Sequence, residues 1–196
     1  VWVMENSDRE IPIINAGCGA LEHPTQALLD YFTIKESFNG NVNNLKIGFI
    51  GDCLRGRTVH SLAKLMSKFD GNEFYFLAPK DLQIDNQTHN YILKHSPNSK
   101  VILDSEGLHQ YLPELDVVYM TRIQDEHGGK GLYPEEFRFK KNDLDRMKPG
   151  AILMHPMPKR DEIDPEIDYL KRDERVMYWR QQRNGMWIRA AIFVYL

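Results

Sequence analysis

The feature that most constrains the fold of this chain is a series of short apolar segments that alternate with segments of helical periodicity. Apolar runs of this length, bounded by turn residues, are typical of buried strands. The runs cover residues 45–51, 73–77, 101–103, 117–120 and 151–154. Helical patterns lie between them at residues 25–37, 57–69, 87–94 and 142–147, with a brief helix expected near Glu106. Strands that alternate with helices predict right-handed βαβ crossovers and a mostly parallel sheet.

The expected fold is therefore α/β: a doubly wound, mostly parallel sheet of about five strands with flanking helices. Residues 176–196 predict a long C-terminal helix, with Asn184 and Gly185 as the point at which it would be interrupted. Residues 128–139 are polar, contain glycine and show no period, so we expect a mobile loop there. We interpret residues 1–10 as the remnant of a preceding domain or linker, and residues 11–196 as one domain.

Composition excludes several classes of function. The 196 residues include 25 basic and 28 acidic side chains, for a net charge of −3. This balance argues against a nucleic-acid surface and against a polybasic membrane patch. No apolar run approaches the ~20 residues that span a bilayer, and no secretion signal is evident. The two cysteines are too few for a disulfide framework, so we expect a reducing, cytoplasmic setting.

Polar and cationic side chains follow the predicted strands at residues 51–58, 121–124 and 155–160. Ligands of open α/β sheets bind beyond the carboxyl ends of the strands, so these segments should share one rim. Arg57 and Arg122 would place two planar guanidinium groups there, and such groups suit bidentate recognition of carboxylate or phosphate. The pair predicts a ligand with two anionic groups. The alternative is that each arginine makes an ordinary surface ion pair.

Other ligand classes find less support. Gly51 and Gly56 lack the G-x-G-x-x-G spacing of a dinucleotide site. The histidines and cysteines show no HExxH or CxxC spacing, so we expect no metal. His23 stands at a predicted helix start, where it could donate to a developing oxyanion or be an ordinary loop residue. His155, at a strand end, is more simply explained as a structural residue.

Four segments, taken together and in order, resemble the aspartate/ornithine carbamoyltransferase family. They are HPTQALLD at residues 23–30, GRTVHSL at 56–62, YMTRIQ at 119–124 and HPMP at 155–158. The resemblance extends from about Ile11 to the end of the chain. It favours the aspartate branch, because ornithine enzymes typically carry H-C-L-P where this chain has HPMP, and their S-M-G triplet does not occur here.

The resemblance implies a reaction in which carbamoyl phosphate and L-aspartate give N-carbamoyl-L-aspartate and phosphate, an early step of pyrimidine synthesis. It implies that His23 polarises the carbamoyl oxygen and that Gln26 holds the carbamoyl amide. The backbone carbonyls of Pro156 and Met157 would accept from amino groups. Positioning and electrostatics suffice for such a reaction, so no cofactor or metal is expected.

The same resemblance assigns the binding of aspartate. Arg57 would bind the α-carboxylate, Arg122 and Gln124 would bind the β-carboxylate, and Thr58 would be a further aspartate-binding residue.

The family's phosphate-binding S-T-R-T motif does not occur in these residues. We therefore expect that the carbamoyl-phosphate domain is absent from this chain and that the chain by itself is inactive. Family members form homotrimers. Two alternatives stay open: a non-catalytic homologue that binds a ligand or partner, and a carbamoyltransferase for another amino acid such as ornithine.

Overall fold

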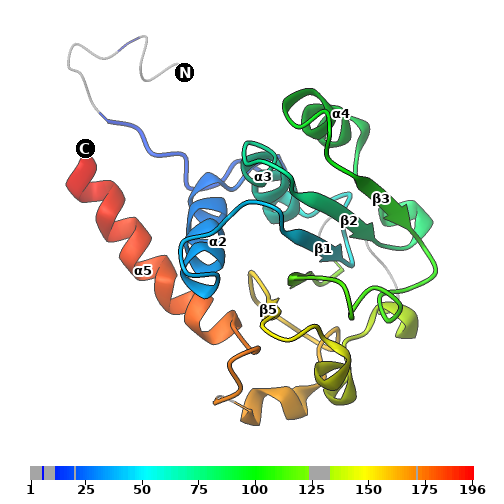
Figure 1. Ribbon diagram of the computed structural model, residues 1–196. Helices are drawn as coiled ribbons and strands as arrows, with labels where there is room; N and C mark the ends of the chain where they lie inside the picture. Colours follow the sequence, from blue (N-terminus) through cyan, green and yellow to red (C-terminus); the bar gives the residue numbers. More distant parts are fainter. Residues whose placement is uncertain (1–5, 7–11, 20, 124–132, 171) are drawn as a thin grey trace.

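The computed structural model describes residues 6, 12–19, 21–123, 133–170 and 172–196. Its centre is a five-stranded sheet with the order β3-β2-β1-β4-β5, in which every neighbouring pair is parallel. The strands are β1 (Lys46–Ile50), β2 (Glu73–Leu77), β3 (Val101–Asp104), β4 (Val117–Met120) and β5 (Ile152–Met154). The predicted α/β class and strand number are confirmed (Figure 1).

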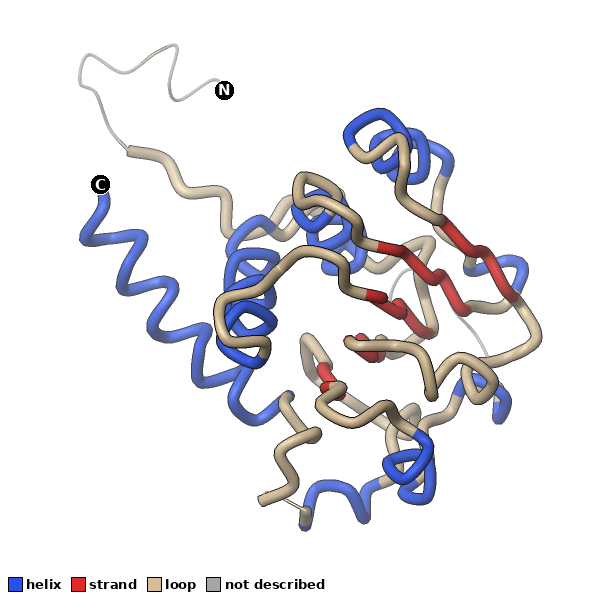
Figure 2. Tube along the Cα trace, in the orientation of Figure 1, coloured by secondary structure: helices blue, strands red, loops and turns tan. Residues whose placement is uncertain are grey.

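Helices connect and flank the strands. The α-helices are α2 (Pro24–Ser37), α3 (Arg57–Met66), α4 (Asn86–His95) and α5 (Tyr178–Tyr195). Short 3-10 helices are η1 (Lys80–Leu82), η3 (Glu135–Phe137), η4 (Lys141–Arg146) and η5 (Pro165–Tyr169). In the figures, α2 lies beside the first part of α5, where the buried residues of α5 are found (Figures 1 and 2).

The two faces of the sheet are covered differently. Strand residues alternate between the faces, so Phe49 packs toward α2, α3 and α4, whereas its neighbour Ile50 packs toward turns and 3-10 helices. The connection from β1 to β2 runs through α3, and the connection from β4 to β5 runs through η3 and η4. β1 and β4 are neighbours whose connections leave in opposite directions, which makes this the topological switch point of the sheet.

Two sequence predictions of helical structure were wrong. The chain near Glu106 forms bends and turns, because Gly107 adopts a φ of +132°, which no right-handed helix accommodates. α5 is not interrupted at Asn184 and Gly185. The Asn184 amide donates to Thr33 Oγ1 at 3.0 Å, and the missing side chain at Gly185 lets α5 lie close to α2, so tertiary packing outweighs weak helix propensity.

The described part of the predicted loop is ordered by its own aromatic side chains. Tyr133, Phe137 and Phe139 are buried against the sheet, and residues 135–137 form η3. The prediction of a mobile loop otherwise concerns residues 128–132, which lie outside the described residues, as do residues 1–5 and 7–10 of the predicted remnant. None of the helices in the described residues has the length and apolar character needed to cross a membrane.

Candidate functional site

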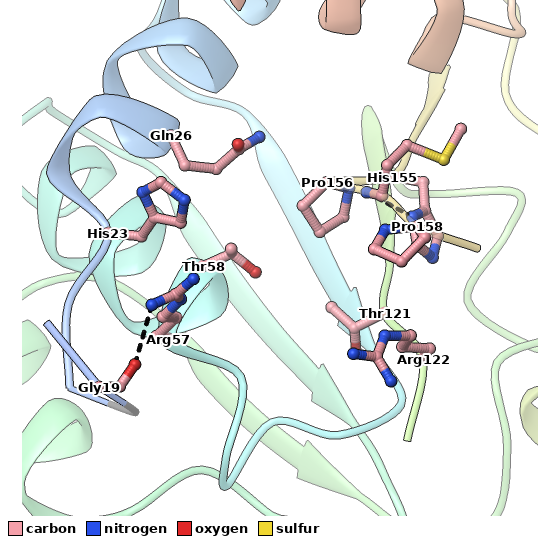
Figure 3. A pocket seen from close by; sticks show the side chains of 11 residues that line it. Gly19, His23, Gln26, Arg57, Thr58, Thr121, Arg122, His155, Pro156 and Pro158 are labelled. Atoms are coloured by element: carbon pink, nitrogen blue, oxygen red, sulfur yellow. Dashed lines mark hydrogen bonds between the residues drawn. The ribbon is translucent and has the colours of Figure 1, made fainter. Parts of the chain in front are cut away.

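A cavity of about 350 Å³ opens at the carboxyl edge of the sheet, beside the switch point. Its walls come from the start of α2, the start of α3 and the loops that follow β4 and β5. Figure 3 shows the α2 and α3 residues facing those of the two loops across the cavity. The lining residues are Gly19, His23, Gln26, Arg57, Thr58, Thr121, Arg122, His155, Pro156, Met157 and Pro158.

His23 is the residue on which α2 begins, with Pro24 at the first helical position, where the missing N–H is not needed. Its backbone N–H donates to Ser61 Oγ at 2.8 Å, which ties the start of α2 to α3. Burial lowers the pKa of the imidazole, and the charges of Arg57 and Arg189 lower it further. The ring is therefore neutral at pH 7, and its Nδ1 has no hydrogen-bond partner in the described part of the chain.

Arg57 is the first residue of α3, and its guanidinium lies beside His23. Nη1 donates to the Gly19 carbonyl at 3.0 Å. A side chain at Gly17 would come within 3.1 Å of Arg57 Nη1 and 3.8 Å of His23 Nδ1, so the guanidinium and the imidazole share one corner of the cavity. The positive end of the α3 dipole adds to the charge of Arg57, and together they favour an anion here.

The loop after β4 supplies the second arginine. Thr121 is fixed to the end of β1, because its N–H and its hydroxyl both donate to the Ile50 carbonyl, at 2.8 and 2.9 Å. The Tyr133 hydroxyl donates to the Thr121 carbonyl at 3.1 Å. Arg122 follows, half-buried, with Nη1 3.5 Å from the Ile123 carbonyl. The two arginines enter the cavity from different strand ends, as the sheet geometry predicts.

His155 anchors the loop after β5. The Met157 N–H donates to His155 Nδ1 at 2.8 Å, so the proton of the neutral ring is on Nε2, which lies 2.8 Å from Glu162 Oε1. Burial lowers the pKa of His155 and keeps the ring neutral. The His155 N–H donates to Gln181 Oε1 of α5 at 2.9 Å. Because Nδ1 accepts from its own loop and Nε2 lies against the buried Glu162 carboxylate, this histidine holds Pro156 and Met157 against the cavity.

Most of the residues predicted from sequence lie around this one cavity. They are His23, Gln26, Arg57, Thr58, Arg122, Pro156 and Met157. Gln124 lies outside the described residues. The binding role of each residue stays a prediction.

The chemistry of the cavity is that of an anion site. Among the described residues, its lining includes two arginines and no carboxylate. Two guanidinium groups in the lining of one cavity suit a ligand that carries carboxylate or phosphate groups. The described residues contain no group of three or more histidine, cysteine, aspartate or glutamate side chains that could hold a metal.

Sequence reasoning missed a buried residue behind the cavity. Asp30 lies four positions after Gln26 and hence on the same face of α2, and it accepts a hydrogen bond from Gln26 Nε2 at 2.9 Å. An aspartate in the apolar middle of a helix was the available signal, because such a residue is rarely buried without partners.

The fold and the cavity define an α/β domain with a cationic site at its switch point. The family profile "Aspartate/ornithine carbamoyltransferase, Asp/Orn binding domain" matches residues 43–196. A second profile, "Aspartate/ornithine carbamoyltransferase, carbamoyl-P binding domain", matches residues 2–36. The chain belongs to the aspartate/ornithine carbamoyltransferase family. The junction between the two matches falls at residues 37–42, just after α2.

Curated relatives include the aspartate carbamoyltransferase catalytic subunits of Alkaliphilus metalliredigens and Clostridium kluyveri. The first is 38% identical over 190 residues, which covers 93% of this chain and 58% of the relative. The second is 40% identical over 196 residues, which covers 95% of this chain and 60% of the relative. The chain therefore spans somewhat less than two thirds of the length of these relatives.

Solved structures of aspartate transcarbamoylases are likewise similar to most of this chain. The catalytic subunit of M. jannaschii aspartate transcarbamoylase is 36% identical with a TM-score of 0.80, covering 94% of this chain and 58% of the other. Aspartate transcarbamoylase from Trypanosoma cruzi in complex with N-(phosphonacetyl)-L-aspartic acid is 34% identical with a TM-score of 0.83, covering 94% of this chain and 57% of the other. The same enzyme has been solved with carbamoyl phosphate and aspartate.

Proposed function

We propose that this chain forms the aspartate-binding part of an aspartate carbamoyltransferase, which transfers the carbamoyl group of carbamoyl phosphate to the amino group of L-aspartate. The observation that carries the proposal is the cavity with Arg57 and Arg122 on opposite walls. Aspartate has two carboxylates on a short carbon chain, so it offers one anion to each guanidinium. The ligands bound in the similar Trypanosoma cruzi structures, which include aspartate and carbamoyl aspartate, fit this pairing.

In this proposal the two arginines determine the orientation of aspartate. Arg57, with Thr58, binds the α-carboxylate, and Arg122, with Gln124, binds the β-carboxylate. A substrate held at both ends presents its amine in one place. Such positioning can lower the barrier of a bimolecular reaction by about 7 kcal/mol when the geometry is well aligned.

His23 and Gln26 act on the other substrate. The amine nitrogen bonds to the carbamoyl carbon, the carbonyl oxygen becomes an oxyanion, and the bond from carbon to the phosphate oxygen then breaks. The phosphate leaves with the electron pair of that bond and can take up the proton that the amine gives up. A neutral His23 donates a hydrogen bond to the oxyanion. Gln26 and the carbonyls of Pro156 and Met157 hold the carbamoyl amide.

The proposed enzyme needs protein groups that this sequence does not contain. The S-T-R-T phosphate motif is not in this sequence, so the phosphate of carbamoyl phosphate is bound by a part of the carbamoyl-phosphate domain that lies outside residues 2–36. We further propose a homotrimer as the working assembly and the cytoplasm as its location. The two cysteines, Cys18 and Cys53, are both free thiols, which fits a reducing compartment.

The test compares Arg122→Ala with wild type in the protein that contains this chain and its carbamoyl-phosphate domain. We expect the KM for aspartate to rise about a hundredfold, since a charge-assisted bidentate contact contributes roughly 3 kcal/mol, while the Kd for carbamoyl phosphate stays unchanged. Arg183→Ala is the matched control, because Arg183 is an exposed arginine on α5 away from the cavity.

Three results would contradict the proposal in different ways. An unchanged aspartate KM in Arg122→Ala refutes the role of Arg122. Carbamoylation of ornithine in preference to aspartate refutes the substrate. Absence of any carbamoyl transfer by the wild-type protein refutes the activity and leaves a homologue that only binds.

A further inference from the structure

A buried polar cluster lies directly behind the cavity and is centred on Asp30 of α2. Its carboxyl group is fully buried and accepts three hydrogen bonds. Oδ1 accepts from Gln26 Nε2 at 2.9 Å and from Gln181 Nε2 at 2.6 Å. Oδ2 accepts from the Tyr119 hydroxyl at 2.7 Å. The donors come from α2, α5 and β4, so this single carboxyl joins three elements that surround the site.

The first consequence concerns the direction of the Gln26 side chain. A carboxylate can only accept hydrogen bonds, so the amide of Gln26 must turn its NH₂ group toward Asp30. Its Oε1 is the other atom of the same amide, at the tip of a side chain that lines the cavity. No group in the described part of the chain bonds to this oxygen, and it remains available as an acceptor for an N–H group of a ligand.

The second consequence concerns the opposite wall. Gln181 uses its NH₂ group on Asp30 and its Oε1 on the backbone N–H of His155, at 2.9 Å. The same logic applies: once the NH₂ group faces the carboxylate, the oxygen must face the N–H donor. Asp30 therefore reaches the loop of Pro156 and Met157 through one glutamine, just as it reaches the cavity through the other.

We propose that Asp30 is a positioning residue, which holds the Gln26 oxygen toward the cavity and keeps the loop after β5 in register with α2, so that both walls present acceptors to the carbamoyl NH₂ group. This inference rests on the proposed function for the identity of the ligand. The arrangement selects a ligand with N–H donors at this point, because a ligand with an oxygen there would face the Gln26 oxygen. Asp30 does not line the cavity, so it acts only through its partners.

The strength of the hydrogen bonds from Gln26 and Gln181 to Asp30 should depend on pH. Burial raises the pKa of Asp30 to about 7, and the hydrogen bonds from Tyr119, Gln181 and Gln26 partly oppose this rise. Tyr119 on β4 is the titratable group that contacts Asp30, and burial raises its pKa well above the usual value, so it stays neutral. α5 contributes the uncharged Gln181. When Asp30 is protonated, a neutral acceptor replaces a charged one, and the hydrogen bonds from Gln26 and Gln181 weaken.

The test uses two variants that preserve shape, Asp30→Asn and Tyr119→Phe, with Thr33→Val as the matched control. Thr33→Val removes a different buried hydrogen bond between α2 and α5, the one from Asn184. In Asp30→Asn we expect the KM for carbamoyl phosphate to rise about tenfold, the factor that corresponds to 1.4 kcal/mol, with little change in the KM for aspartate. Thr33→Val should change neither.

The pH profile adds a readout that a purely structural role would not move. Wild type should lose affinity for carbamoyl phosphate as pH falls through about 7, and Asp30→Asn should lack this limb. Tyr119→Phe removes a donor to the carboxylate, so the limb should shift to higher pH. A limb that persists unchanged in both variants overturns the proposal, as does a carbamoyl phosphate KM that Asp30→Asn leaves at the wild-type value.

A measurement independent of activity separates this inference from the proposed function. The side-chain NH₂ resonances of Gln26 in the 196-residue chain should shift with pH in wild type and not in Asp30→Asn. Resonances that are the same in both proteins at every pH overturn the role of Asp30. If the wild-type enzyme makes no carbamoyl-aspartate, the proposed function fails, and these resonances alone decide whether Asp30 holds Gln26.

Discussion

Replacement of Asp30 by asparagine should raise the stability of the fold relative to wild type as pH increases, because only the wild-type protein must then bury a charge at this position. The folded protein raises the pKa of Asp30 from 3.8 to about 7, since the carboxyl group is fully buried in α2. The folded state therefore binds this proton more tightly than the unfolded state does. The stability that this tighter proton binding contributes is fully present below about pH 4 and is lost as pH rises through 7.

The size of the effect follows from the shift. A difference of about three pH units between the folded and unfolded pKa corresponds to about 4 kcal/mol, since each unit is worth 1.36 kcal/mol. The asparagine variant has no proton to lose at this position. The free energy of unfolding of the variant minus that of wild type should therefore rise by roughly 3 kcal/mol between pH 5 and pH 8. All other titrating groups are common to both proteins and cancel in this difference.

The assay is urea denaturation of both proteins at several pH values, followed by far-ultraviolet circular dichroism, with stability obtained by linear extrapolation. A difference in stability that stays constant from pH 5 to pH 8 would show that Asp30 titrates near its ordinary pKa. A difference that falls with pH would show that the folded state prefers the ionised form. Either result refutes the reasoning from burial.

Three further outcomes can be checked on the same chain. Gly51→Ala should destabilise the fold by about 1–3 kcal/mol in urea titration, because the φ of +109° strains an alanine and its Cβ would collide with the Thr121 carbonyl after β4. An unchanged midpoint of unfolding would mean that the turn can relax. Glu162→Gln should cost roughly 1–3 kcal/mol of stability, because the buried carboxylate 2.8 Å from His155 Nε2 loses its charge, and thermal melts that overlay wild type would exclude this. A thiol reagent should modify the exposed Cys18 rapidly and Cys53 only on unfolding, since burial raises the pKa of the Cys53 thiol; two equally fast thiols in the native protein would contradict its burial.

The convergence of the two arginines could be predicted from the sequence because it depends on the sheet alone. Arg57 and Arg122 each follow a strand of a parallel sheet, and the carboxyl ends of parallel strands lie at one edge. No knowledge of side-chain packing was needed. Local patterns of apolar residues determined the strands, and topology then placed the arginines together.

The cluster around Asp30 could not be predicted in the same way. Gln181 is separated from Asp30 by 151 residues, and nothing in the pattern of α5 distinguishes this glutamine from its neighbour Gln182. Which glutamine faces inward depends on the rotation of α5 against α2, and that rotation is set by close contacts such as the one at Gly185. The wrong prediction of a helix interruption at Asn184 has the same origin, since a tertiary hydrogen bond outweighed the low helix propensity of this residue.

The long separation between Asp30 and Gln181 also sets the order of events during synthesis. The ribosome completes α2 long before it makes α5, and at roughly 5–20 residues per second the interval is about 8–30 s. Throughout that interval the nascent chain has Asp30 and Gln26 but lacks the helix that buries them. Strands β1 to β4 can pair meanwhile, because their partners are already made. The cavity therefore takes its final form only after α5 has left the ribosome, and chains that end before Gln181 cannot assemble it.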